Sequence, residues 1–178
     1  SSPWTLSLPR GPLPILPAEP PRSLTDWLFL LYLAGALGLA LWYLGCALRL
    51  SLRVSRGVPV EGPRRAAIDA VAQRYQLPRP RRVVECRWER SPFLTGFFAP
   101  ALVLPMGWEP DEAVILHELL HLKHRDLWAG WLTAALRCLH WCDSLLWLAF
   151  DKADNDREAL CDQRVLERLE GEDRRDYG

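Results

Sequence analysis

The longest uncharged stretch of the chain is the feature that most restricts its fold. Residues 27–48, 22 in a row, carry no charged side chain. As an α-helix they would extend about 33 Å, enough to cross a hydrocarbon core of about 30 Å. Trp27, Trp42 and Tyr43 lie toward the two ends, where interfacial aromatic residues are common. A signal peptide fits less well, because the run is too long and no small-x-small cleavage site follows it. We therefore expect a transmembrane helix over residues 26–50.

Arginine is distributed unequally on the two sides of this segment. Two arginines precede it and five follow it closely, against a single glutamate at position 61. They are Arg10 and Arg22 before the segment, and Arg49, Arg53, Arg56, Arg64 and Arg65 after it. The positive-inside rule then places residues 51–178 in the cytosol and the chain in the plasma (inner) membrane. Residues 1–25, which hold seven prolines within the first 22 positions, are expected to form an extended outer loop.

Composition limits the remaining choices. The 22 basic and 22 acidic residues balance, so charge gives no sign of direct nucleic-acid binding, and the basic cluster after the span is explained by anionic lipid and topology. Five cysteines, an odd number, do not indicate a disulfide framework. The length allows one modest domain beside the span. Cys138 and Cys142 flank His140, which leaves a second metal site as a minor alternative to buried thiols.

Residues 114–121 read Val-Ile-Leu-His-Glu-Leu-Leu-His. His117 and His121 are four residues apart, so on a helix both imidazoles face one side and can reach one metal ion. Glu118 would project near the open side of the metal and take a proton from a bound water, whose pKa zinc lowers to about 7. The acidic residues near position 111 favour a helix over about 111–125. The alternative is a buried His/Glu hydrogen-bond cluster without metal.

A third ligand is expected from a second helix, at about 144–170. Glu158 and Asp162 are four residues apart and share one face of it. We expect Glu158 to complete a zinc site, and Asp162 to accept the free ring N–H of a ligand histidine. The alternative is a solvated charged face, because other charged residues lie nearby: Asp151, Lys152, Asp154, Asp156 and Arg157.

Three ordered segments carry a family resemblance over residues 25–178. They are the run from His117 to Asp126, the run from Asp156 to Asp162, and the segment from Ser91 to Pro105. Together they resemble the BlaR/MecR-type integral-membrane metallopeptidases, the antirepressor peptidases associated with β-lactam sensing. The resemblance departs at residues 140–144, where His-Trp-Cys-Asp-Ser replaces the usual His-Trp-Phe-Asn-Pro, although Asp143 can still cap a helix. Because the first residue is not methionine and the resemblance implies that the family segment continues past residue 178, we expect the peptidase domain to be incomplete at its C-terminus.

The expected fold is α+β and helix-dominated: an N-terminal transmembrane helix followed by a gluzincin-like metallopeptidase domain with a small sheet. Helical spacing predicts a helix over 64–75, and residues 82–88 read as a strand. Residues 93–98 and 101–104 are expected to form a hairpin whose edge holds an extended substrate. We expect the metal helix to run on to about 139 and to break at 140–143. The sequence does not decide whether the tryptophans of 127–150 pack into the domain or against the bilayer.

The expected activity is that of a membrane-anchored, Zn²⁺-dependent endopeptidase. Its protein substrate would be a cytosolic transcriptional repressor, or the chain itself, in a signalling response such as β-lactam resistance. Glu118 would be general base and then general acid. The oxyanion donor stays unassigned among His140, Arg137 and Tyr177, and His124 lies too far along the helix to share the ion. The alternatives are a housekeeping membrane zincin, of the prenyl-protein or quality-control type, and a non-catalytic membrane signalling module.

Overall fold

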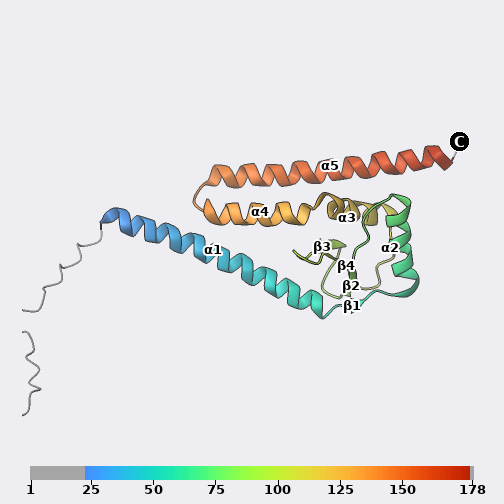
Figure 1. The fold of residues 1–178 in the computed structure, drawn as a ribbon, viewed down its shortest axis with the longest axis horizontal. Helices are drawn as coiled ribbons and strands as arrows, with labels where there is room; N and C mark the ends of the chain where they lie inside the picture. The colour runs from blue at the N-terminus through green and yellow to red at the C-terminus, as the bar shows by residue number, and fades with distance from the viewer. Residues whose placement is uncertain (1–22, 177–178) are drawn as a thin grey trace, which may run out of the picture.

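The structure is a computed structural model that describes the backbone of residues 23–176 and the side chains of residues 23–171. Most of the expected outer loop, residues 1–22, lies outside this range, as does Tyr177. The described part contains five helices and a four-stranded sheet, in a helix-dominated α+β fold (Figure 1). The fold class expected from the sequence is therefore confirmed.

The N-terminal helix α1 (Leu24–Ser55) is longer than the predicted span. It begins with a capping box, in which the Ser23 hydroxyl accepts the N–H of Asp26 and the Asp26 carboxylate accepts the N–H of Ser23 at 2.7 Å. Within the part of the chain that the structure describes, Val54 is the only buried residue of α1. The helix is long and apolar enough to cross a membrane, and most of its leucines are exposed, outside the core of the domain.

The small sheet has the strand order β1-β2-β4-β3. Its strands are β1 (Val58–Pro59), β2 (Arg82–Cys86), β3 (Phe93–Thr95) and β4 (Ala101–Pro105). β3 and β4 form the predicted antiparallel hairpin, whereas β2 and β4 run parallel. All five residues of β4 are buried, as expected for a strand that is covered on both faces. The hairpin therefore places β3 at one edge of the sheet. β1, two residues long, had no clear sequence signal.

The core lies where α2 (Gly62–Arg74) and α3 (Glu112–His124), the helix that carries both histidines of the motif, meet the sheet. α3 begins at Asp111, whose side chain accepts the N–H of Val114 at 3.1 Å. One face of α3 is fully buried, with Ile115, Leu116, Leu119 and Leu120. Truncating a buried leucine typically costs about 2–5 kcal/mol, so this face fixes α3 firmly, and with it the histidines on its other side.

The prediction that the metal helix runs on to about 139 is wrong. α3 ends at His124, and Arg125 adopts a left-handed conformation, with φ at 59°, before α4 (Asp126–Leu139) begins. Such a conformation costs a non-glycine residue about 1–3 kcal/mol and persists where surrounding contacts fix it. The break at Arg125 therefore separates α3 from α4 four residues after His121.

The predicted break at 140–143 is present. Asp143 caps α5 (Ser144–Asp176), since its Oδ1 accepts the N–H groups of Leu145 and Leu146 at 3.0 and 3.3 Å. α4 and the first part of α5 form a helical hairpin that extends beside α1, and the second part of α5 passes over α3 (Figure 1). α5 therefore links the hairpin to the domain.

Candidate metal centre

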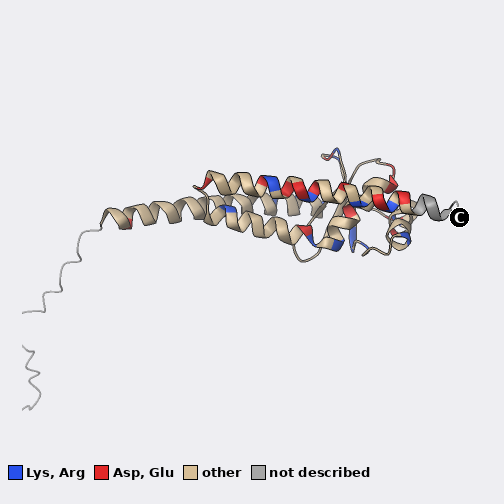
Figure 2. Cartoon of the chain, turned by 90° about the horizontal axis from the view of Figure 1, so that it is seen from above, with Lys and Arg blue, Asp and Glu red and all other residues tan. Residues whose placement is uncertain are grey.

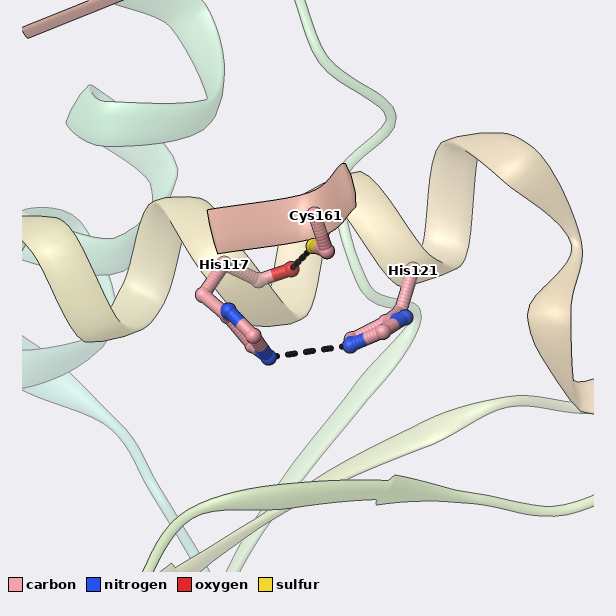
Figure 3. A group of neighbouring side chains, drawn as sticks. All are labelled: His117, His121 and Cys161. Atoms are coloured by element: carbon pink, nitrogen blue, oxygen red, sulfur yellow. Dashed lines mark hydrogen bonds between the residues drawn. The ribbon is translucent and has the colours of Figure 1, made fainter. Parts of the chain in front are cut away.

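The two histidines of α3 point at one spot. The rings of His117 and His121 are 4.6 Å apart between centroids, and their Nε2 atoms are 2.9 Å apart. Figure 3 shows both rings leaving the same side of α3 with these nitrogens facing each other. The buried leucine face on the opposite side of the helix holds this orientation.

Glu158 comes to the same spot from α5. Its Oε2 lies 3.5 Å from Nε2 of His117 and 3.3 Å from Nε2 of His121. Zinc binds nitrogen and oxygen at about 2.0–2.2 Å in tetrahedral sites, which corresponds to ligand atoms about 3.3 Å apart. The three atoms therefore form a triangle of the size that a zinc ion requires. The crossing of α3 and α5 therefore brings together the three side chains that the sequence predicts as ligands.

The other ring nitrogens face carboxylates. Nδ1 of His117 lies 3.0 Å from Oδ1 of Asp162, and Nδ1 of His121 lies 2.6 Å from Oδ2 of Asp126. When Nδ1 carries the proton and donates to the carboxylate, the Nε2 lone pair is free for a metal. Asp162 has the position predicted for it. The sequence gives no signal for Asp126 as a partner, because its approach depends on the helix break at Arg125.

Glu118 is the buried carboxyl group of the site. Its exposed fraction is 9%, and a backbone hydrogen bond links it to Leu94 of β3. Burial raises the pKa of Glu118 to about 7, although the neighbouring His121 opposes the rise. A carboxyl group with a pKa near neutrality is well matched to taking up and returning a proton at physiological pH.

Cys161 is close to the histidines but differs from Glu158 as a ligand. Its sulfur falls within a group, with the two imidazoles, whose ligand atoms are all within 4.8 Å of one another. The thiol donates to the carbonyl oxygen of His117 at 3.6 Å, and Figure 3 shows it directed at the α3 backbone. Burial raises its pKa to about 12, which disfavours the thiolate that metals bind. We therefore favour Glu158 over Cys161 as third ligand.

A cavity of about 550 Å³ opens beside these residues. Glu118, Glu158 and the two histidines line one part of it. The other lining residues include Leu94 of β3, Leu127 and Trp131 of α4, and Tyr43, Cys46, Ala47 and Leu50 of α1. The participation of α1 had no sequence signal, because it depends on packing between distant segments. The edge strand β3 borders the cavity, as the expected role in holding an extended substrate requires.

Other polar candidates differ in whether they line the cavity. Arg157, which pairs with Asp154 at 2.7 Å, lines the cavity and was not singled out as an oxyanion donor. Arg137 and His140 lie toward the far end of the α4–α5 hairpin (Figure 1). His124 contacts the carbonyl oxygen of Leu120 at 2.9 Å and Arg164 at 3.3 Å. Arg157 is thus better placed than Arg137 or His140 to contact a bound substrate.

Substituting Asp126→Asn should weaken zinc binding by about 10- to 100-fold, because the amide orients the His121 ring less strongly than the carboxylate does. Competition titration against a fluorescent zinc chelator measures the change. The control is Asp156→Asn on the exposed face of α5, where the partner is Lys152 at 3.4 Å. Equal zinc affinity in the two variants would show that the Asp126 contact does not support the metal.

This combination of fold and site defines a class. A helix bearing His-Glu-x-x-His, a second helix bringing a carboxylate, and an edge strand beside the cavity are the features of a metallopeptidase domain. The chain belongs to the BlaR1 peptidase M56 family, and the match covers residues 16–178. With the apolar helix α1, this membership makes the chain a membrane protein of a peptidase family.

Two relatives show the extent of the similarity. The "Regulatory protein BlaR1" of Bacillus licheniformis is 31% identical over 94 residues, which are 50% of this chain and 16% of that protein. The "Methicillin resistance mecR1 protein" of Staphylococcus aureus is 32% identical over 94 residues, 49% of this chain and 16% of the relative. The matched segment therefore spans about a sixth of the length of these relatives.

Proposed function

We propose that the chain is a membrane-anchored zinc-dependent endopeptidase. The observation that carries the proposal is the convergence of Nε2 of His117, Nε2 of His121 and Oε2 of Glu158, at 2.9–3.5 Å from one another, beside the buried Glu118. His117, His121 and Glu158 would hold the ion. A bound zinc would supply an acidified water and polarise the scissile carbonyl.

The protein side chains would manage the proton and the substrate. Glu118 would take a proton from the attacking water and return it to the leaving amine, which requires the near-neutral pKa that burial gives it. Asp162 and Asp126 would hold the imidazole rings in their binding tautomer. An extended peptide would lie along β3, whose outer edge has no partner strand in the described sheet.

The substrate and the orientation are parts of the same proposal. The arginines that follow the apolar run support a domain facing the cytosol. Two relatives are named for regulation and for methicillin resistance, which supports a role in a β-lactam signalling response. The substrate would then be a cytosolic transcriptional repressor or the chain itself, with the bilayer as the other partner.

Metal removal tests the proposal directly. The full chain in liposomes should bind zinc stoichiometrically, lose cleavage of a quenched fluorescent peptide library and of itself after 1,10-phenanthroline treatment, and regain it with added zinc. Mass spectrometry of metal content and fluorescence measure the two properties. Cleavage by the metal-free chain would reject the zinc mechanism. A zinc-loaded chain that cleaves neither the library nor itself would instead favour the non-catalytic signalling module.

A further inference from the structure

The α4–α5 turn contacts the N-terminal half of α1. The Tyr32 hydroxyl donates to the carbonyl oxygen of Leu139, and the Trp141 indole N–H donates to the carbonyl oxygen of Tyr32 at 3.1 Å. A Cβ atom at Gly35 would lie 2.4 Å from the Trp141 ring, so this close approach depends on a glycine. The contacts fix the turn at one level along α1.

This level lies inside the apolar run. Tyr32 and Gly35 belong to the uncharged residues 27–48, and Gly35 is 13 residues before the end of the run at Leu48. At 1.5 Å per residue, that separation is about 20 Å. If α1 crosses a bilayer, the turn that contacts Gly35 must therefore lie well within the hydrocarbon thickness.

We propose that residues 127–150, the α4–α5 hairpin, enter the bilayer beside α1 as a re-entrant helical hairpin whose outer surface contacts lipid. The inference rests on α1 crossing the membrane and does not depend on peptidase activity. The hairpin would enter from the side that holds the sheet and the metal centre, because both of its ends connect there (Figure 1).

The surface of the hairpin has the composition that lipid contact requires. No residue of α4 is buried, and large apolar side chains are exposed along both helices: Trp128, Trp131, Leu132, Leu139, Leu145 and Leu148. Exposed apolar surface of this extent commonly marks a membrane or protein interface. Figure 2 shows that most of α1 and the start of α5 carry no charge, whereas charged residues gather over the rest of α5 and the domain.

The charged residues of the hairpin are paired or used as caps. Arg137 and Asp143 are the only two between positions 127 and 150. The Arg137 side chain, 17% exposed, reaches Oδ1 of Asp151 at 2.6 Å and lies 5.2 Å from the Trp147 ring centroid. Side chains on a helix lean toward its N-terminus, so Arg137 extends from the hairpin toward its domain end, as arginines near an interface do.

Several backbone groups of the turn have hydrogen-bond partners within the protein. Asp143 accepts the first free N–H groups of α5, and its own N–H donates to the carbonyl oxygen of His140 at 3.0 Å. Tyr32 satisfies the carbonyl oxygen of Leu139. Non-helical backbone at membrane depth is tolerated where protein groups supply such partners. The catalytic cavity, which Leu127 and Trp131 also line, would then open at the membrane interface.

Cysteine accessibility tests the insertion with a control on the same helix. In a background with the five native cysteines replaced by alanine, Leu148→Cys probes the hairpin and Leu166→Cys probes the distal part of α5. These leucines are similarly exposed, at 66% and 60%. Leu41→Cys, at 59% exposure, probes α1. The full chain is placed in nanodiscs, where both bilayer faces meet a water-soluble maleimide, and labelling is repeated in SDS.

Leu148→Cys and Leu41→Cys should label at least about 10-fold more slowly than Leu166→Cys, since the reactive thiolate forms in water, and all three should label alike in SDS. Equal labelling rates for Leu148→Cys and Leu166→Cys, with Leu41→Cys protected, would contradict insertion of the hairpin while still supporting α1 as a membrane span. Rapid labelling of Leu41→Cys would contradict both the membrane span and the inserted hairpin. A bimane fluorophore attached to Leu148→Cys should be quenched by nitroxide-labelled lipids. If Leu148→Cys were protected from the maleimide but its bimane were not quenched, a protein partner would cover the hairpin, and the inference would again be overturned.

Tryptophan fluorescence gives a second measurement if the cysteine-free background does not fold. Brominated lipids should quench the native chain, and Trp131→Phe, at a residue of α4 that borders the cavity and is 37% exposed, should reduce that quenching. Trp108→Phe, at a residue that packs against the domain core, serves as the control. Quenching that is the same in both variants would contradict contact between the hairpin and lipid.

Discussion

Substituting Glu118→Gln should lower the rate of peptide cleavage by about 10²- to 10⁴-fold, the usual contribution of a positioned acid–base group, while zinc stays bound. Gln has the same shape and can still accept the hydrogen bond that links residue 118 to Leu94. It cannot take a proton from water. Because the carboxyl group is already buried, a neutral amide in its place should not weaken the fold.

The measurement compares kcat at matched zinc occupancy for native chain, Glu118→Gln and a control, Glu167→Gln. Glu167 is exposed on α5 and accepts a hydrogen bond from Gln163 at 2.8 Å. The control should retain native kcat and native zinc affinity. If Glu118→Gln also cleaved at the native rate, the proton would have to pass through another group, and the mechanism proposed for Glu118 would be wrong.

The metal helix and the placement of its partners could be predicted because they depend on local patterns. His117 and His121 share a helix face at any position in a fold, and so do Glu158 and Asp162 on theirs. The starts of α3 and α5 were readable from Asp111 and Asp143, whose side chains cap them. The β3–β4 hairpin was also predictable, from two apolar runs separated by a short turn.

The parts that could not be predicted depend on contacts between distant segments. Arg125 takes a left-handed conformation that is usual for Gly or Asn. The sequence therefore carries no signal for the end of α3 and predicts a longer helix. The contact of Asp126 with His121 follows from that break. The approach of α1 to the cavity and to the α4–α5 turn likewise arises from packing between distant segments. Residue spacing within a single helix does not predict such packing.

The second large effect is expected from substitution of the proposed third ligand, Glu158. Glu158→Ala should lower zinc affinity by more than the 10- to 100-fold typical of a partner that only supports a ligand, because it removes a charged donor from the ion itself. The Glu158 side chain is 53% exposed, so its truncation leaves little cavity and the fold should persist. Cleavage should fall with zinc occupancy.

Cys161→Ser is the matched comparison, because Cys161 is three residues along the same helix and close to the same imidazoles. Its thiol is directed at the His117 carbonyl oxygen and held protonated by burial, and a serine hydroxyl can donate to the same oxygen. Zinc affinity should therefore stay near native in Cys161→Ser. Competition titration of both variants separates the two ligand sets. If Cys161→Ser lost zinc affinity and Glu158→Ala retained it, the ligands would be the two histidines and the Cys161 thiolate. Glu158 would then be free to contact substrate.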